Sequence, residues 1–319
     1  MVRFICVISS LFFSITAQAA KENSNHPKVI AVTQIISHPS LDKIRRGIVD
    51  SLRDSGFEEG KNLTIVFDNA QGSVATATQI AHKFRGISPD VAVGIATPSA
   101  QALASVFQGT STPVVFAAVT DPKTAGLAPD HLEGKVLITG TTDFPPVDQQ
   151  IALIRKMCPE RRRIGVLYSV GEINAKKQVQ SLKNLLKPGE TLIEIPIQSS
   201  AEILFALRHH LPLVDVIHIP LDNMIVANLP SVVHVAHAHK VPVFTSHPEG
   251  VLEVGALGTV GIDQYQSGYE TGKLVSQILQ GVSVKKIPVL FLKKAETHIN
   301  RKIAKNFGAR LPENTGECP

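Results

Sequence analysis

The sequence contains no tryptophan, only three tyrosines and three cysteines, and aromatic residues make up 5% of its 319 positions. Several enzyme motifs are also missing: a nucleophile elbow, a Walker loop, a glycine-rich dinucleotide turn and a His-Glu-x-x-His helix. An acid–base pair of Asp121 and Glu172 would need an activated reaction partner, and the sequence identifies none. We therefore expect a protein that is not an enzyme and that uses no cofactor.

Charge is sparse and is not concentrated in one region. Charged residues account for 18% of the chain, and the formal net charge is +5. The densest basic runs, 161–163 and 285–286, have no interleaved aromatic residues that would stack on bases, which argues against a nucleic-acid partner. A hydrophobic content of 44% is typical of a soluble globular protein, and the length allows two domains with full cores.

The first twenty residues have the layout of a secretory signal peptide. Arg3 supplies a positive start, residues 4–15 form an apolar core, and Ala17-Gln18-Ala19 is a small-x-small cleavage site. The core is too short for a membrane-spanning helix. We expect cleavage and a periplasmic or extracellular location for the mature protein.

Two cysteines remain after this cleavage, Cys158 and Cys318. An oxidising compartment would allow them to form a disulfide that ties the C-terminal tail to the second half of the chain. Two unpaired thiols are the alternative, and the sequence leaves both open.

Short apolar strands alternate with amphipathic helices over the first half of the chain. The pattern predicts strands at 29–34, 63–68 and 89–96, with helices at 39–56, 74–84 and 98–107. This alternation implies a parallel sheet with helices on both faces.

Residues 134–146 are rich in Gly, Thr and Pro and read as a linker, after which the alternation starts again. Strands are predicted at 164–168, 191–196, 214–220 and 241–246, and helices at 147–157, 172–186, 201–210 and 223–239. A further helix reaches residue 279, and a last one covers 298–307. The predicted fold class is α/β, with two Rossmann-like lobes in tandem.

Polar side chains occupy four corners at which a predicted strand runs into a predicted helix. The corners are Thr97-Pro98-Ser99, Thr120-Asp121-Pro122, Glu172-Ile173-Asn174 and Asp222-Asn223. Thr97 is expected to cap its helix, and a helix start of this kind favours a bound carboxylate. In open α/β sheets such corners lie where ligands bind. These residues can also be plain helix caps or first-turn acids.

The order and spacing of several stretches resemble the periplasmic substrate-binding proteins of ABC importers with the type I two-lobed fold, specifically the TrpX-like group. The stretches are 38–42, 56–62, 96–100, 113–122, 168–174, 222–223 and 261–265. The sequence departs from the group's pattern at His247-Pro248-Glu249-Gly250 and at Gln264.

This resemblance implies two lobes joined by three crossover segments. Residues 28–143 with 257–283 would form the first lobe, and 144–256 with 284–319 the second. It also implies a small solute in the cleft, an amino acid for which an aromatic side chain is one option, and delivery to an ABC permease in the membrane.

An amino acid needs acceptors for its ammonium group and donors for its carboxylate. Guided by the resemblance, we assign the carboxylate to Thr97, Ser99 and Thr120. We assign the ammonium to some combination of Asp121, Glu172 and Asp222. Neutral hydrogen bonds, cleft lining and ring contacts are assigned to the rest of the set: Thr33, Gln34, Asn174, Asn223, Tyr168 and Asp263. Tyr265, Phe116 and Phe144 are further candidates for stacking on a ring.

Two other functions remain open at this point. A ligand-sensing protein for a membrane receptor would share the fold and the cleft. A metal-binding receptor would use histidines such as His234 and His237, which lie three apart on one predicted helix. The predicted corners carry Asp, Glu, Thr and Ser in place of His, so no metal site is assigned.

Overall fold

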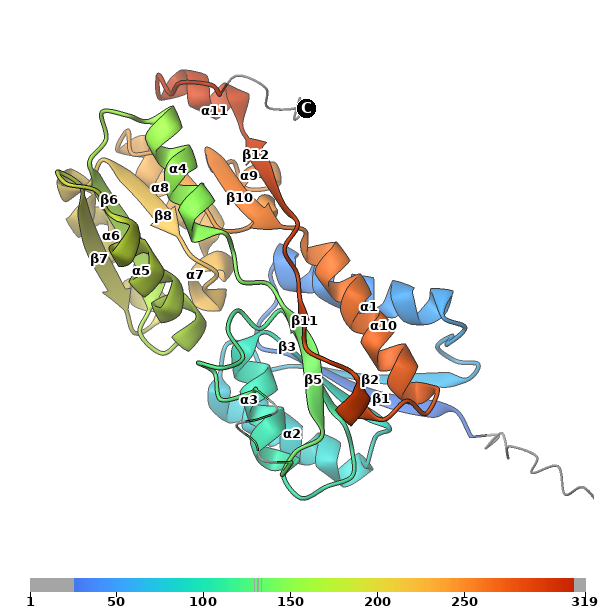
Figure 1. Ribbon diagram of the computed structural model, residues 1–319. Helices are drawn as coiled ribbons and strands as arrows, with labels where there is room; N and C mark the ends of the chain where they lie inside the picture. Colours follow the sequence, from blue (N-terminus) through green and yellow to red (C-terminus); the bar gives the residue numbers. More distant parts are fainter. Residues whose placement is uncertain (1–25, 129, 131, 133, 313–319) are drawn as a thin grey trace, which may run out of the picture.

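The computed structural model describes residues 26–128, 130, 132 and 134–312. They form two lobes, each built on a six-stranded sheet, and three chain segments run between the lobes (Figure 1). This confirms the predicted fold class. No helix within the described ranges is long and apolar enough to cross a membrane. The predicted signal peptide lies outside these residues.

The sheet of the first lobe is parallel, with strand order β11-β5-β4-β3-β1-β2. Its strands are β1 (Lys28–Gln34), β2 (Leu63–Asn69), β3 (Val91–Ile95), β4 (Val114–Ala117), β5 (Ile138–Thr142) and β11 (Leu290–Phe291). Its central strands β3 and β4 are short, buried apolar runs, as expected where helices cover both faces of a parallel sheet. The covering helices are α1 (Pro39–Asp54), α2 (Val74–Ile87), α3 (Thr97–Val106) and α10 (Gln264–Leu279), followed by the short turn η3 (Val284–Lys286).

The second lobe has the strand order β12-β10-β9-β8-β6-β7, and only β12 runs antiparallel to its neighbour. Its strands are β6 (Arg163–Ser169), β7 (Thr191–Ile197), β8 (Val216–Ile219), β9 (Val243–Thr245), β10 (Gly258–Ile262) and β12 (Ala295–Ile299). Its helices are α4 (Val147–Met157), α5 (Ile173–Leu185), α6 (Ile203–His210), α7 (Asn223–Ala227), α8 (Leu229–Ala238), α9 (Pro248–Leu252) and α11 (Arg301–Asn306), with turns η1 (Ser200–Glu202) and η2 (Leu211–Leu213).

The two lobes exchange segments differently from the predicted boundaries. Strand β10 pairs with β9 and β12 in the second sheet, so the chain returns to the first lobe only after Ile262. Strand β11 pairs with β5, which keeps residues 284–291 in the first lobe. The assignment of 257–262 to the first lobe and of 284–291 to the second was therefore wrong.

Two predicted helices also differ. The helix expected over 223–239 is split into α7 and α8, because Asn228 ends the first and Pro230 lies in the first turn of the second. The helix expected from His298 starts at Arg301, because His298 belongs to β12 and Asn300 caps the helix by accepting a hydrogen bond from the Ile303 N–H at 3.0 Å. Cys158 is buried, and Cys318 lies outside the described residues, so their pairing stays a prediction.

A close contact between α1 and α10 fixes the segment that returns to the first lobe. A Cβ on Gly268 would overlap the Ile44 carbonyl, and a Cβ on Gly47 would overlap the Tyr265 carbonyl. Only glycine permits this approach of two backbones. The Tyr265 hydroxyl also donates a hydrogen bond to Asp50 at 3.0 Å. This packing anchors the start of α10, which carries Gln264 at the cleft.

Candidate functional site

A cavity lies between the lobes, at the carboxyl ends of strands from both sheets, where α/β folds bind ligands. It contains about 380 Å³ of empty space, counted with the part open to solvent. Its lining residues come from both lobes: His38, Ser40, Leu41, Ala96, Thr97, Ala118, Thr120, Asp143, Asn174, Leu221, Asp222, Asn223, Val226, His247 and Gln264. Five of the predicted site residues are among them: Thr97, Thr120, Asn174, Asp222 and Asn223.

The N-terminus of α3 faces this cavity through Ala96 and Thr97. The expected cap was wrong: Ala96 is the cap residue, with a φ of 69°, and Thr97 makes no capping hydrogen bond. The first turn of α3 packs directly against β3. A Cβ on Gly94 would lie only 2.7 Å from the Ala100 Cα. The N–H groups of the first turn and the positive end of the helix dipole therefore meet the cavity.

The corner at Thr120 differs from the prediction, because a turn and not a helix follows it. The carboxylate of Asp121 accepts hydrogen bonds from the Lys123 and Thr124 N–H groups and from the Thr124 hydroxyl. Burial raises the pKa of Asp121, but these bonds and Lys177 outweigh it, so the pKa lies below its usual value. Asp121 does not line the cavity, whereas Thr120 does.

Glu172 is occupied within the second lobe. Its carboxylate accepts from the N–H groups of Asn223 and Met224 at 2.9 and 3.1 Å, and from the side-chain amides of Asn223 and Asn174. It thus holds the start of α7 and does not line the cavity.

Asp222 lines the cavity but also has partners of its own. It accepts from the Ser169 N–H and hydroxyl at 2.5 and 2.7 Å, and it caps α7 through the Ile225 N–H at 2.9 Å. Burial, followed by the nearby charge of Glu172, raises the pKa of Asp222. Through these contacts Asp222 links the start of α7 to the end of β6.

The side-chain amide of Asn174 lies in the cavity lining. Its Nδ2 donates to Glu172 and to the Leu221 carbonyl at 2.9 and 2.8 Å. Its Oδ1 is buried and has no hydrogen-bond partner among the described residues. This leaves one acceptor at the cavity.

The remaining predicted residues lie away from the cavity lining. Tyr168 donates its hydroxyl to Glu194 at 3.0 Å, and Asp263 caps α10 through the Gln266 N–H at 3.0 Å. Thr33, Gln34 and Ser99 are fully buried in the first lobe. None of the four aromatic residues considered for ring stacking lines the cavity.

Asp143 is a cavity residue that the sequence reasoning missed. It directly follows β5 on the first crossover, is buried, and has an Oδ1 without a partner in the described part of the chain. Burial raises the pKa of Asp143 to about 6, although hydrogen bonds from Gln264 and Thr120 act in the opposite direction. Its signal was an acid at the carboxyl end of a strand, inside a segment interpreted as a linker.

Two histidines were missed as well. Both ring nitrogens of His38 and the Nε2 of His247 are buried without partners within the described ranges. Burial, with a smaller contribution from His247, lowers the pKa of His38 to about 3, so His38 is neutral at physiological pH. The His247 Nδ1 accepts from the Gly250 N–H at 3.2 Å. His247 is part of the stretch that departs from the resembled pattern.

Across the residues that the structure describes, no group of three or more His, Cys, Asp or Glu side chains is arranged to hold a metal ion.

A family model described as ABC transporter substrate binding protein matches residues 29–317. The chain belongs to this family. The protein is thus the substrate-binding component of an ABC transporter.

Relatives of this binding protein are similar to it in sequence over nearly the whole chain. A tyrosine-binding protein of Clostridioides difficile (strain R20291) is 37% identical over 88% of this chain and 81% of its own length. A Streptococcus pneumoniae ABC domain solved in complex with L-Trp is 36% identical, with a TM-score of 0.83 over 90% of this chain and 96% of that one.

A further solved relative is described as ligand-free and open. A ligand-free, open substrate-binding protein with adhesive properties from Clostridium difficile is 35% identical and gives a TM-score of 0.65, over 90% of this chain and 97% of that one. Its identity to the binding protein is nearly the same as that of the L-Trp complex, but its TM-score is lower.

Proposed function

We propose that the binding protein takes up an aromatic amino acid in the interlobe cavity and delivers it to its permease. The observation that carries this proposal is Asp143. A buried carboxylate with an unpartnered oxygen, on the first crossover between the lobes, is suited to an ammonium group. Asp143 replaces Asp121 and Glu172 in this role, because the oxygens of those two carboxylates accept hydrogen bonds from protein donors and neither residue lines the cavity.

The carboxylate of the amino acid fits a part of the lining that carries positive partial charge. The start of α3, at Ala96 and Thr97, offers backbone N–H groups and the positive end of a helix dipole without a full charge. The hydroxyl of Thr120 lies in the same lining. On the second lobe, the unpartnered Oδ1 of Asn174 accepts a further hydrogen bond from the ammonium, so that the ligand bridges both lobes.

The side chain of the amino acid meets apolar surface. Leu41, Leu221 and Val226 line the cavity together with the flat imidazole rings of His38 and His247. These groups suit an aromatic ring even though no Phe or Tyr of the described residues lines the cavity. The L-Trp complex and the tyrosine-binding relative support the same class of ligand.

We also propose that the protein is exported, because residues 1–20 have the layout of a cleaved signal peptide. A soluble receptor outside the cytoplasm would capture the solute and pass it to the permease on closure.

Identification of the natural solute tests the proposal. The mature protein is purified without denaturation, then unfolded, and the released small molecules are analysed by mass spectrometry. We expect tyrosine, tryptophan or a related aromatic amino acid. A released sugar or another solute without an amino group would contradict the assignment of Asp143.

A further inference from the structure

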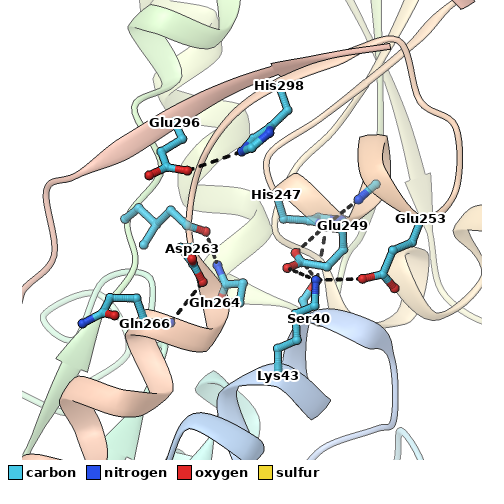
Figure 2. A network of polar contacts seen from close by, with 12 residues as sticks. Ser40, Lys43, His247, Glu249, Glu253, Asp263, Gln264, Gln266, Glu296 and His298 are labelled. Atoms are coloured by element: carbon cyan, nitrogen blue, oxygen red, sulfur yellow. Dashed lines mark hydrogen bonds and ion pairs between the residues drawn. The ribbon is translucent and has the colours of Figure 1, made fainter. Parts of the chain in front are cut away.

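A second set of polar contacts joins the lobes beside the cavity, between α1 and α9 (Figure 2). Lys43 on α1 lies with its Nζ 3.2 Å from Glu249 Oε1 and 2.7 Å from Glu253 Oε1 on the other lobe. The hydroxyl of Ser40, one turn earlier on α1, donates to Glu249 Oε2 at 3.0 Å. Glu249 is therefore bound by two residues of the opposite lobe.

Within its own lobe, Glu249 lies beside His247. The Nδ1 of His247 lies 3.6 Å from Glu249 Oε2 and 3.3 Å from the Ser40 hydroxyl. The Glu249 side chain is 4% exposed, whereas that of Glu253 is 41% exposed. Burial raises the pKa of Glu249, but His247 and Lys43 outweigh it and bring the pKa to about 2. The buried carboxylate is thus ionised at physiological pH.

A buried carboxylate is tolerated only while its partners remain in place. When the lobes separate, Glu249 loses Lys43 and Ser40 together, and its remaining neighbour is His247. The contact therefore belongs to the closed arrangement of the lobes.

The same contact reaches the ligand cavity. Ser40 and His247 line that cavity, one from each lobe, whereas Glu249 lies behind them and does not. Figure 2 shows Ser40, His247 and Glu249 meeting at the interface between the two lobes. We propose that Glu249 is a positioning residue that couples occupation of the cavity to closure, because it accepts a hydrogen bond from the lining residue Ser40, lies beside the lining residue His247 and binds Lys43 across the cleft.

Coupling follows from the shared partners. A ligand that contacts Ser40 and His247 restricts the two cavity-lining side chains that lie next to Glu249. Glu249 in turn stabilises the positions in which these side chains contact the ligand. The contact adds stability only to the closed state, so it slows the escape of the ligand more than it alters its entry. The inference rests on the proposed function for the choice of ligand alone.

The test compares Glu249→Gln with the matched control Glu253→Gln. Glu253 contacts the same lysine but is half exposed and touches neither lining residue. We expect Glu249→Gln to speed dissociation of L-tyrosine or L-tryptophan by about tenfold, the equivalent of one charge-assisted hydrogen bond, and Glu253→Gln by less than about twofold. Stopped-flow fluorescence measures these rates.

A second readout needs no ligand. Spin labels on exposed positions of α2 and α6 report the distance between the lobes in the ligand-free protein. We expect Glu249→Gln to shift this distribution toward longer distances and Glu253→Gln to leave it in place. If the wild type binds no amino acid, the proposed function fails, and these distances alone decide the role of Glu249.

Lys43→Met keeps the hydrogen bonds of Glu249 to Ser40 and removes its cross-lobe charge. Combined with Glu249→Gln, it should speed dissociation by less than about twofold more, because both changes break the Lys43–Glu249 pair and only the exposed Lys43–Glu253 pair is lost in addition. Equal effects of Glu249→Gln and Glu253→Gln would overturn the proposal. So would unchanged dissociation and unchanged distances in Glu249→Gln, with only the melting temperature lowered, because that is the signature of a purely structural residue.

Discussion

Lys177 on α5 lies with its Nζ 3.3 Å from Oδ2 of Asp121, which follows β4, so the two residues form an ion pair between the lobes. The two side chains are 40% and 21% exposed, so water screens the pair. Such exposed pairs contribute at most about 1 kcal/mol. This pair is more exposed than the Glu249 contact, so we expect its removal to affect ligand binding less.

Lys177→Met should therefore change ligand affinity by less than about fivefold, and the change should shrink at high salt. Calorimetric titration at low and high ionic strength measures both effects. A large loss of affinity that persists at high salt would show that Asp121 contributes to the site directly, as the sequence had predicted.

Asp143→Asn should abolish the recognition of the ammonium group while preserving the shape of the cavity. Removal of one partner of a buried charge pair costs on the order of 2–5 kcal/mol, so affinity should fall by about 30-fold or more. The matched control is Asp121→Asn, whose side chain does not line the cavity. If the control loses more affinity than Asp143→Asn, the ammonium site has been assigned to the wrong carboxylate.

Asp143 should also make the stability of the ligand-free protein depend on pH. Its pKa is raised to about 6 in the folded protein, so folding is favoured while the group is protonated and loses this support as the pH rises through 6. A shift of about two units corresponds to about 3 kcal/mol. Relative to the wild type, Asp143→Asn should thus gain stability between about pH 4 and pH 6 and stay level above that. Urea unfolding at several pH values checks this, and a difference that is the same at every pH would refute it.

The approach of α1 and α10 predicts a strong effect of a single methyl group. Gly268→Ala places a Cβ on the Ile44 carbonyl, so the helices must move apart, at a cost of about 1–3 kcal/mol or more. Gly86→Ala in α2 is the control, because a Cβ there meets no atom within 4 Å, and it should be neutral or slightly stabilising. Thermal unfolding of both variants measures the difference, and equal melting temperatures would contradict the packing described.

The alternation of elements was predictable because buried parallel strands are continuous apolar runs, as in β3 and β4, and the helices between them carry one apolar face. The break after Asn228 has a visible signal, Pro230, but its consequence depends on packing within the second lobe. No local signal in the sequence indicated which lobe contains β10, since its pairing with β9 and β12 is a property of the folded sheet.

The site was predicted in part for the same reason. Asn174, Asp222 and Asn223 follow strands and reach the cavity, as strand ends do in this fold. Glu172 has the same kind of position, but the N–H groups of α7 take its oxygens, and Asn223 lies 51 positions later in the sequence. The contact of Ser40 with His247 and Glu249 spans more than 200 positions, so no local pattern indicates it.

Calorimetric titration of the mature protein, freed of bound solute, with L-tyrosine and L-tryptophan tests the central claim most directly. The N-acetyl derivatives serve as controls because they lack the positive charge assigned to Asp143. We predict saturable binding of at least one of the two amino acids at one site per chain, and no binding of its N-acetyl form. Absence of binding for both amino acids, or equal binding of the acetylated form, would contradict the account.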